Sequence, residues 1–335
     1  MPLILDRADV LDVYDYTRQK KWVLPTFNSE NLTTTEAILS AVSEYGEFIG
    51  INNLPIIVGI TNTYKDRPQA VYYTHTKRWD IGLKLFLQDL KVLTDKGSAF
   101  EHLRVMVHLD HIIWDEDRDL LGWDMSQFSS IMYDASTLPF EENIRKTAAF
   151  VEQFGQEIVI EGACDEIQKS GGMNDPLGLT TPEVAVRYQN ETGIDILVPN
   201  LGTEHRSKKS TLKYHGESAR QISNQIGKVL CLHGSSSVSK KHLANLYEDG
   251  ICKVNMWTAL ERESTKALFE EMVKNSAKVV GPEMTKTLIA DKILAEPVDF
   301  QDTQSIKYFT TLYRQEIIFR KMKEIITHYL KLWYR

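Results

Sequence analysis

The sequence predicts one domain over residues 1–335, an α/β fold of the (β/α)8 TIM barrel type. Short apolar runs alternate with amphipathic stretches, which predicts parallel strands joined by helical crossovers. Eight such runs occur, and each stays apolar until a polar residue appears near its carboxyl end. In a closed barrel these eight ends share one rim, whereas a doubly wound sheet brings only a few together. The pattern therefore favours the closed barrel.

The eight predicted strands share this apolar run with a polar end. They span residues 24–28, 54–61, 103–110, 129–135, 157–163, 195–201, 228–233 and 250–255. The polar residues at or near their ends are Asn28, Thr61, Asn62, Asp110, His111, Asp134, Glu161, His205, His233 and Asn255. Active sites of such barrels lie at this rim, so these side chains are the first candidates for chemistry.

Helical patterns fill the intervals between the strands. The clearest are residues 33–46, 139–154 and 181–192. Thr181 and Pro182 are typical of an N-cap and a first helical position, and Gly193 is typical of a helix end.

Two segments are longer than a barrel requires. Residues 63–102, between the second and third strands, are predicted to form a helical insertion over the rim. Residues 305–335 are predicted to form a C-terminal helical extension with one apolar stripe. The stripe comprises Leu312, Ile318, Met322, Ile325, Tyr329 and Leu332. We expect it to pack against the barrel or a second subunit, and binding to a membrane surface is the less favoured alternative.

Composition limits the classes of partner. The net charge of −7 argues against nucleic-acid binding, which usually requires a basic surface. No apolar run approaches the roughly 20 residues of a membrane span. The first residues lack the features of a signal peptide, so we expect a cytoplasmic protein. Cys164, Cys231 and Cys252 are accordingly expected to be reduced thiols.

Three histidines at strand ends predict a metal site. His111, His205 and His233 could together bind one catalytic Zn²⁺ per chain and leave one coordination position open. Co²⁺ and Fe²⁺ are alternative metals, since imidazole also suits them. A single histidine is more often an ordinary core or surface residue, but three at equivalent positions are harder to explain in that way. His108 is the main rival ligand.

Asp110 directly precedes the first of these histidines. A carboxylate at the end of an apolar strand is costly unless it is paired, bound to metal or used in catalysis. We therefore predict that Asp110 is a general acid/base beside the metal. The alternative is a carboxylate that only orients a histidine, for which Asp134 and Glu161 are better placed.

Small residues follow the sixth, seventh and eighth strands. Loops after the seventh and eighth strands of barrels often bind phosphate through backbone N–H groups and hydroxyls. The predicted contacts are Gly202, Gly234, Ser236 and Thr258, with positive charge from Arg206 and Lys209. The alternative is that these segments are only tight turns.

Several blocks, in this order, resemble the class II metal-dependent ketose-bisphosphate aldolases of the fructose-bisphosphate and tagatose-bisphosphate type. They cover most of residues 20–260. The blocks are LPTFNSENLTTTEAILSAV, HLDH, SSIMYDASTLPFEENI, TTPEVAVRYQNETGIDILVPNLGTEH, LHGSS and GICKVNM.

The resemblance implies reversible retro-aldol cleavage of a ketose phosphate or a related hydroxyketone through a metal-stabilised enediolate. Asp110 would be the acid/base, while Glu161 and Glu166 would supply further catalytic carboxylates. Asn28, Thr61 and Asn255 would contact substrate. A dimer or larger homo-oligomer is also implied.

The chain departs from the family pattern around the predicted substrate. Ala163 stands where a second glutamate is usual, Ser235 and Arg206 stand in place of glycines, and Trp257 replaces an aspartate. These changes imply a substrate other than fructose 1,6-bisphosphate, with Arg206 pairing an anionic group. The alternatives are a non-catalytic, metal-containing barrel that binds a sugar phosphate, and a metal-dependent hydrolase.

Overall fold

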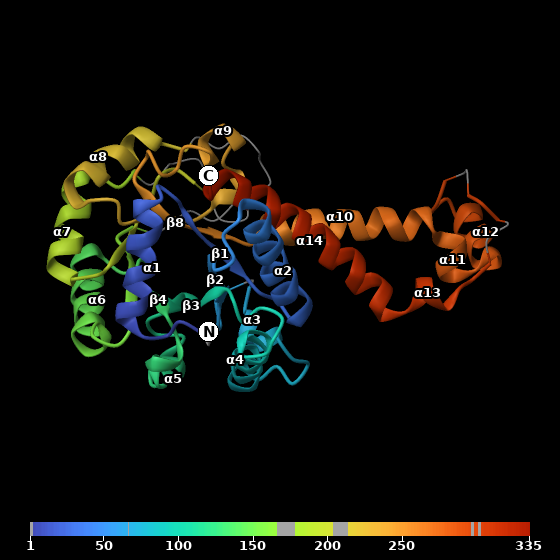
Figure 1. The fold of residues 1–335 in the computed structure, drawn as a ribbon, viewed down its shortest axis with the longest axis horizontal. Helices are drawn as coiled ribbons and strands as arrows, with labels where there is room; N and C mark the ends of the chain where they lie inside the picture. The colour runs from blue at the N-terminus through green and yellow to red at the C-terminus, as the bar shows by residue number, and fades with distance from the viewer. Residues whose placement is uncertain (1–2, 66, 166–177, 204–213, 296–297, 301–302) are drawn as a thin grey trace.

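The computed structural model describes residues 3–65, 67–165, 178–203, 214–295, 298–300 and 303–335. Eight parallel strands close into a barrel in chain order, with β1 paired to both β2 and β8. They are β1 (Leu24–Asn28), β2 (Pro55–Ile60), β3 (Arg104–Ile113), β4 (Ser130–Asp134), β5 (Val159–Ala163), β6 (Ile196–Val198), β7 (Leu230–Leu232) and β8 (Ile251–Met256). The predicted (β/α)8 barrel is therefore confirmed (Figure 1).

Helices surround the barrel and extend from it. The longer ones are α1 (Arg7–Gln19), α2 (Leu32–Ile49), α4 (Trp79–Thr94), α6 (Phe140–Phe154), α7 (Pro182–Thr192), α8 (Gly216–Ile226), α10 (Thr258–Lys274), α12 (Pro282–Ala290) and α14 (Thr311–Trp333). The short ones are α3 (Gln69–Tyr72), α5 (Arg118–Leu121), α9 (Lys240–Leu243), α11 (Ser276–Val280) and α13 (Ile306–Phe309), with 3-10 turns η1 (Met125–Gln127) and η2 (Ser235–Ser237).

The caps expected around α7 are present. The hydroxyl of Thr181 accepts a hydrogen bond from the Val184 amide, and Pro182 is the first helical residue. Gly193 ends the helix with φ at 73°, a left-handed conformation that glycine adopts without a steric penalty. Local sequence therefore determines both ends of this crossover helix.

Helix α1 closes the amino end of the barrel. Its apolar residues Val10, Val13 and Tyr14 belong to one buried cluster with interior side chains such as Ile57 and Met106. Asp6 begins the helix by accepting hydrogen bonds from two backbone amides. The lower barrel is thus a packed apolar core, which leaves the carboxyl rim for polar groups.

The insertion between β2 and β3 divides into two parts. Helix α4 buries Leu83, Phe86 and Leu90 in the main core and acts as the crossover between the two strands. The short α3 places Gln69 beside β1, where its side chain contacts Asn28. The turn from Thr61 to α3 is therefore the part of this insertion that contacts the predicted site.

The C-terminal extension is helical, as predicted, but its buried face differs from the predicted stripe. The buried residues of α14 are Ile317, Met322, Ile326, Leu330 and Trp333. Of the predicted stripe, Met322 is buried, whereas Leu312 is 70% exposed. The first turns of α14 lie on an arm that projects from the barrel, formed with α10–α13 (Figure 1). The rest of α14 packs against both α2 and α10. Because two helices cover it, the buried face of α14 is shifted from the stripe that the sequence predicts.

No helix in the described part of the chain is both long enough and apolar enough to span a membrane. Cys164, Cys231 and Cys252 are free and buried.

Candidate metal centre and substrate site

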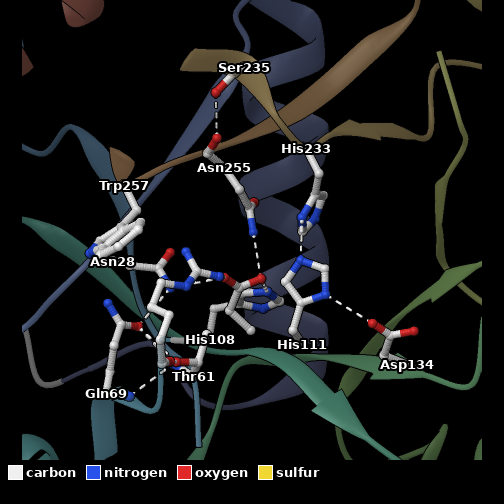
Figure 2. A network of polar contacts seen from close by, with 12 residues as sticks. Asn28, Thr61, Gln69, His108, His111, Asp134, His233, Ser235, Asn255 and Trp257 are labelled. Carbon is white, nitrogen blue, oxygen red and sulfur yellow. Dashed lines mark hydrogen bonds and ion pairs between the residues drawn. The ribbon is translucent and has the colours of Figure 1, made fainter. Parts of the chain in front are cut away.

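The rim brings together residues from strands that are distant in sequence. Asn28 ends β1, Asp110 and His111 lie in β3, His233 follows β7, and Asn255 lies in β8. All five are at most 8% exposed. Figure 2 shows Asn28, His111, His233 and Asn255 near one another, and Asp110 accepts hydrogen bonds from both asparagines. The predicted residues His205, Arg206, Lys209 and Glu166 lie outside the described ranges.

His111 is held in an unusual backbone conformation. Its φ is +49°, and the pairing of β3 with β4 shifts register between Leu109 and Ile112. A bulge of this kind redirects a side chain, and positive φ outside glycine often marks a functional position. The His111 ring stacks on Tyr64 with centroids 4.5 Å apart, and its Nδ1 lies 2.9 Å from Oδ2 of Asp134. These contacts fix the ring so that Nε2 faces the site.

The two described histidines form the core of a metal-binding set. Nδ1 of His233 lies 3.1 Å from Nε2 of His111 (Figure 2). Asp110, His111 and His233 each offer a ligand atom, and the three atoms lie within 4.8 Å of one another. Burial lowers the pKa of His233, which favours the neutral imidazole that metals bind. The carboxylate behind His111 is the usual partner of a metal-bound histidine. This donor set fits Zn²⁺.

A second group comprises Glu161, Cys231 and His233. Its three potential ligand atoms also lie within 4.8 Å of one another. Burial raises the pKa of the Cys231 thiol far above its usual value, and the negative charge of Glu161 raises it further. A metal binds the thiolate rather than the thiol. The His111–His233 pair, with Asp110 beside it, is therefore the better candidate for the metal centre.

The Asp110 carboxylate is fully buried and hydrogen-bonded on both oxygens. Oδ1 accepts from Nδ2 of Asn255 at 2.9 Å. Oδ2 accepts from Nδ2 of Asn28 at 2.9 Å and from Nη2 of Arg67 at 2.8 Å. Burial alone would raise the pKa of Asp110, but its electrostatic interactions with His111 and with the Arg67 guanidinium outweigh it and hold that pKa well below its usual value. Asp110 is consequently ionised at neutral pH, as a proton acceptor must be.

A charged pair lies beneath the rim. Lys253 on β8 and Glu161 on β5 are fully buried, with Nζ and Oε1 2.8 Å apart. Lys253 also donates to Oδ1 of Asn255 at 2.6 Å. Burial opposes the ionised form of Glu161, yet the charge of Lys253 outweighs it and depresses the Glu161 pKa. Glu161 therefore stays charged, and Lys253 links it to the amide that contacts Asp110.

His108, the rival ligand, belongs to this lower layer. Its Nδ1 lies 2.9 Å from the Ser130 hydroxyl, and its Nε2 lies 3.4 Å from Nζ of Lys253. Burial and the charge of Lys253 lower its pKa to about 3. Since Lys253 can only donate, Nε2 accepts from it and is engaged away from the His111–His233 pair. His108 is also absent from both candidate metal groups of the described residues.

The β2 loop supplies site contacts that sequence reasoning missed. Oε1 of Gln69 accepts from Nδ2 of Asn28 at 3.0 Å and from the Thr61 amide at 2.9 Å. The Thr61 hydroxyl donates to the Arg67 carbonyl oxygen. Thr61 thus shapes the loop that carries Gln69 and Arg67. An isolated arginine in a polar loop gives no sequence signal of its position.

The turns after β7 and β8 border a small cavity at the rim. It has a volume of about 30 Å³, and its lining includes Arg67, Asp110, His233, Ser236, Trp257 and Thr258. Gly234 has φ at 66°, which a residue with a side chain adopts at a cost. The Ser235 hydroxyl turns away and donates to the Asn255 carbonyl at 2.6 Å. The predicted phosphate contacts Gly234, Ser236 and Thr258 therefore border the cavity that Asp110 faces.

Gly202 lies after β6 with φ at 79°, and its amide donates to Oδ1 of Asn200 at 3.0 Å. This amide is therefore engaged in the turn itself. Its predicted role toward phosphate depends on the neighbouring residues 204–213, which lie outside the described ranges.

Comparisons with known proteins identify the family to which the chain is similar. Residues 8–328 match the family model of class-II fructose-bisphosphate aldolase. The fructose-bisphosphate aldolases of Staphylococcus aureus and Staphylococcus epidermidis are each 28% identical over 288 residues, which is 84% of this chain and 90% of theirs.

Solved structures show the same fold. A fructose-bisphosphate aldolase from Campylobacter jejuni superposes with a TM-score of 0.73 at 18% identity, covering 99% of this chain and 96% of that one. The YdjI aldolase from Escherichia coli gives a TM-score of 0.65 at 20% identity, covering 96% and 94%.

Proposed function

The chain belongs to the class II fructose-bisphosphate aldolase family, whose members are aldehyde-lyases, and from that premise we propose a zinc-dependent aldolase. The reaction is the reversible cleavage of a ketose phosphate or a related hydroxyketone. The observation that carries this proposal is the position of the ionised Asp110 beside the His111–His233 pair. A proton acceptor next to a metal site is what retro-aldol chemistry requires.

The metal would be held by His111 and His233, with His205 as the predicted third ligand. When bound, it supplies a Lewis acid that polarises a carbonyl oxygen. Asp134 orients His111 through the Nδ1 hydrogen bond. Glu161, which lies 4.0 Å from Nε2 of His233, is proposed to orient that ring rather than to exchange protons with substrate. Glu166 stays a prediction.

Asp110 is proposed to accept the proton of the hydroxyl next to the scissile bond. The O–H electrons then form the new aldehyde C=O as the carbon–carbon electrons leave toward the polarised ketone. In the condensation direction Asp110 returns the proton. Asn28 and Asn255 hold the carboxylate from two sides, which fixes the direction of transfer.

The substrate phosphate is proposed to bind near Gly234, Ser236 and Thr258. These residues border the cavity, and Thr258 is the first residue of α10. Backbone amides and the positive end of a helix dipole favour an anion at such a position. Arg206 and Lys209 remain predicted contributors of positive charge, with Arg206 predicted to pair an anionic group.

A homo-oligomer is proposed from the arm of α10–α14. Several of its apolar side chains are exposed, namely Phe269, Met284, Ile293, Ile306, Phe309 and Leu312. Large apolar side chains left exposed in one part of a protein often mark a surface that a partner covers. A second copy of this chain would bury these side chains while leaving the barrel rim open.

The test is a coupled assay for aldehyde release from a panel of ketose monophosphates and bisphosphates, with wild type and Asp110→Asn. We expect cleavage of at least one ketose, reduced about 10²- to 10⁴-fold in the variant. Asp124→Asn, an exposed aspartate, is the control. Release of inorganic phosphate without aldehyde would favour a hydrolase, and tight ketose binding without either product would favour a binding protein.

A further inference from the structure

A cation, Arg67, lines the cavity beside the proposed base. The guanidinium of Arg67 donates from Nη2 to Oδ2 of Asp110 at 2.8 Å, and the two side chains are 9% and 0% exposed. Arginine carries its charge at every physiological pH and offers five donors in a planar fork. Only one of these donors contacts Asp110.

Aromatic rings hold this guanidinium in place. Its central carbon lies 5.1 Å from the Trp257 ring centre and 5.5 Å from the Tyr64 ring centre. Trp257 is itself anchored by a hydrogen bond from its indole N–H to Glu30. The Arg67 backbone is tied down as well, since its carbonyl accepts from the Gln69 amide at 3.0 Å. The charge is therefore preorganised, which lowers the entropic cost of binding an anion.

We propose that Arg67 is a specificity-determining residue that binds an oxyanion of the substrate, either a carboxylate or a phosphate, close to the reacting hydroxyl. This inference rests on the proposed function, because it takes Asp110 as the base and the cavity as the substrate site. It places a positive charge for substrate binding on the loop after β2. This charge adds to Arg206 and Lys209, which the sequence predicts on the loop after β6. Planar, bidentate contacts to carboxylate and phosphate are what a guanidinium provides best.

An anionic substrate group would give Arg67 a second partner beside Asp110. The cavity has a volume of about 30 Å³, room for roughly two waters, and Arg67 forms part of its lining next to Asp110. An incoming oxyanion offers Arg67 an alternative carboxylate-like partner. Oδ2 of Asp110 would then keep only the hydrogen bond from Asn28, and the freed lone pair could accept the substrate proton.

Trp257 takes part in this arrangement. It stands where the family pattern has an aspartate, and a carboxylate there would place a negative charge beside the same cavity. The indole instead provides a face for the guanidinium, an interaction worth more when it is desolvated. The presence of Trp257 in place of an aspartate thus favours an anionic group of the substrate at this position. An aspartate here would instead favour substrate hydroxyls.

The test uses the full-length, zinc-loaded protein and calorimetric titration with inorganic phosphate and, separately, malonate. We expect Arg67→Met to weaken binding of the recognised oxyanion about 10- to 100-fold, and Arg67→Lys to weaken it less. Loss for phosphate alone identifies a phosphate subsite, and loss for malonate alone identifies a carboxylate subsite. Arg118→Met is the matched control, because Arg118 is exposed and lies over Trp114, outside the lining of this cavity.

Unchanged binding of both anions in Arg67→Met, or no binding of either by wild type, would overturn the inference. A kinetic comparison separates it from the proposed function. Arg67→Met should raise KM for an anionic ketose more than it raises KM for an uncharged one. If anions bind in an Arg67-dependent way but no ketose is cleaved, the aldolase proposal is refuted and the anion site stands. If ketoses are cleaved and Arg67→Met keeps the wild-type preference for charged ketoses, only the anion site is refuted.

Discussion

Nζ of Lys253 lies 2.8 Å from Oε1 of Glu161, and both side chains are completely buried beneath the rim of the barrel. Lys253 also donates to Asn255, whose amide donates to Asp110. A chain of hydrogen bonds thus connects a buried ion pair to the proposed base. The pair helps to fix the position of Asn255 and, through it, of Asp110.

Removing one member of this pair should destabilise the protein strongly. Lys253→Met leaves the Glu161 carboxylate buried without its counter-charge, and we expect a loss of about 3–5 kcal/mol in the free energy of unfolding. Urea denaturation followed by circular dichroism measures it. The double variant Lys253→Met/Glu161→Leu should recover much of this loss, and a double variant no more stable than Lys253→Met would contradict the explanation by an unpaired charge.

His108 should make stability depend on pH. Its pKa is about 3 in the folded protein against an ordinary value of 6.5, so below pH 6.5 the unfolded chain binds the proton more readily. The free energy of unfolding should therefore fall as the pH decreases from 6.5 toward 3, by up to about 1.4 kcal/mol per pH unit from this group.

His108→Gln removes the titrating ring and should flatten that part of the profile. The measurement is urea denaturation at several pH values for both proteins. Because the buried carboxylates Asp110 and Glu161 remain in both, the difference between the two profiles isolates His108. If the free energies of unfolding of wild type and His108→Gln changed in parallel between pH 6.5 and 3, His108 would be protonated in the folded state over that range, which would contradict this prediction.

Asp134 should act through the metal rather than on substrate. It holds Nδ1 of His111 at 2.9 Å and thereby fixes the ring and its tautomer. We expect Asp134→Asn to weaken Zn²⁺ binding about 10- to 100-fold, as measured by competition with a chromophoric chelator. Asp124→Asn is the control, since Asp124 is exposed and caps η1. Equal affinities in wild type and Asp134→Asn would remove Asp134 from the metal site.

The arm should mediate self-association. Phe269 is 70% exposed on α10 and Ile306 is 72% exposed on α13, so a charge at either position is tolerated by the monomer. We expect the double variant Phe269→Lys/Ile306→Lys to shift the molecular mass from light scattering toward that of a single chain. Phe48→Lys, at a residue 79% exposed on α2 away from the arm, should leave the mass unchanged. A single-chain mass for the wild type would exclude this role for the arm.

Local patterns were sufficient to predict the barrel and several of the side chains that meet at its rim. The end of an apolar strand marks the rim, so Asn28, Asp110, His111, His233 and Asn255 could all be predicted from strand ends. The structure brings these five side chains together. The bulge that gives His111 its positive φ could not be predicted, because it arises from pairing with β4.

Other features depend on tertiary structure. Lys253 lies two positions before Asn255 and shares its side of the strand, but lysine in a strand is usually exposed, so its burial required knowledge of Glu161 on β5. Arg67 lies in a polar loop whose path depends on Gln69 and Trp257. The stripe predicted on α14 was only partly correct, since packing between α2 and α10 rotates the buried face.

A metal bound at the rim of the barrel is proposed to support the aldol chemistry. The most direct measurement is elemental analysis of zinc in wild type, His233→Ala and the exposed control His75→Ala, each also assayed for ketose cleavage. We predict about one zinc per chain and cleavage in wild type and His75→Ala, with both lost in His233→Ala while circular dichroism shows a folded barrel. Cleavage that persists in a zinc-free His233→Ala protein, or a wild type that takes up no zinc even when it is supplied, would contradict the account.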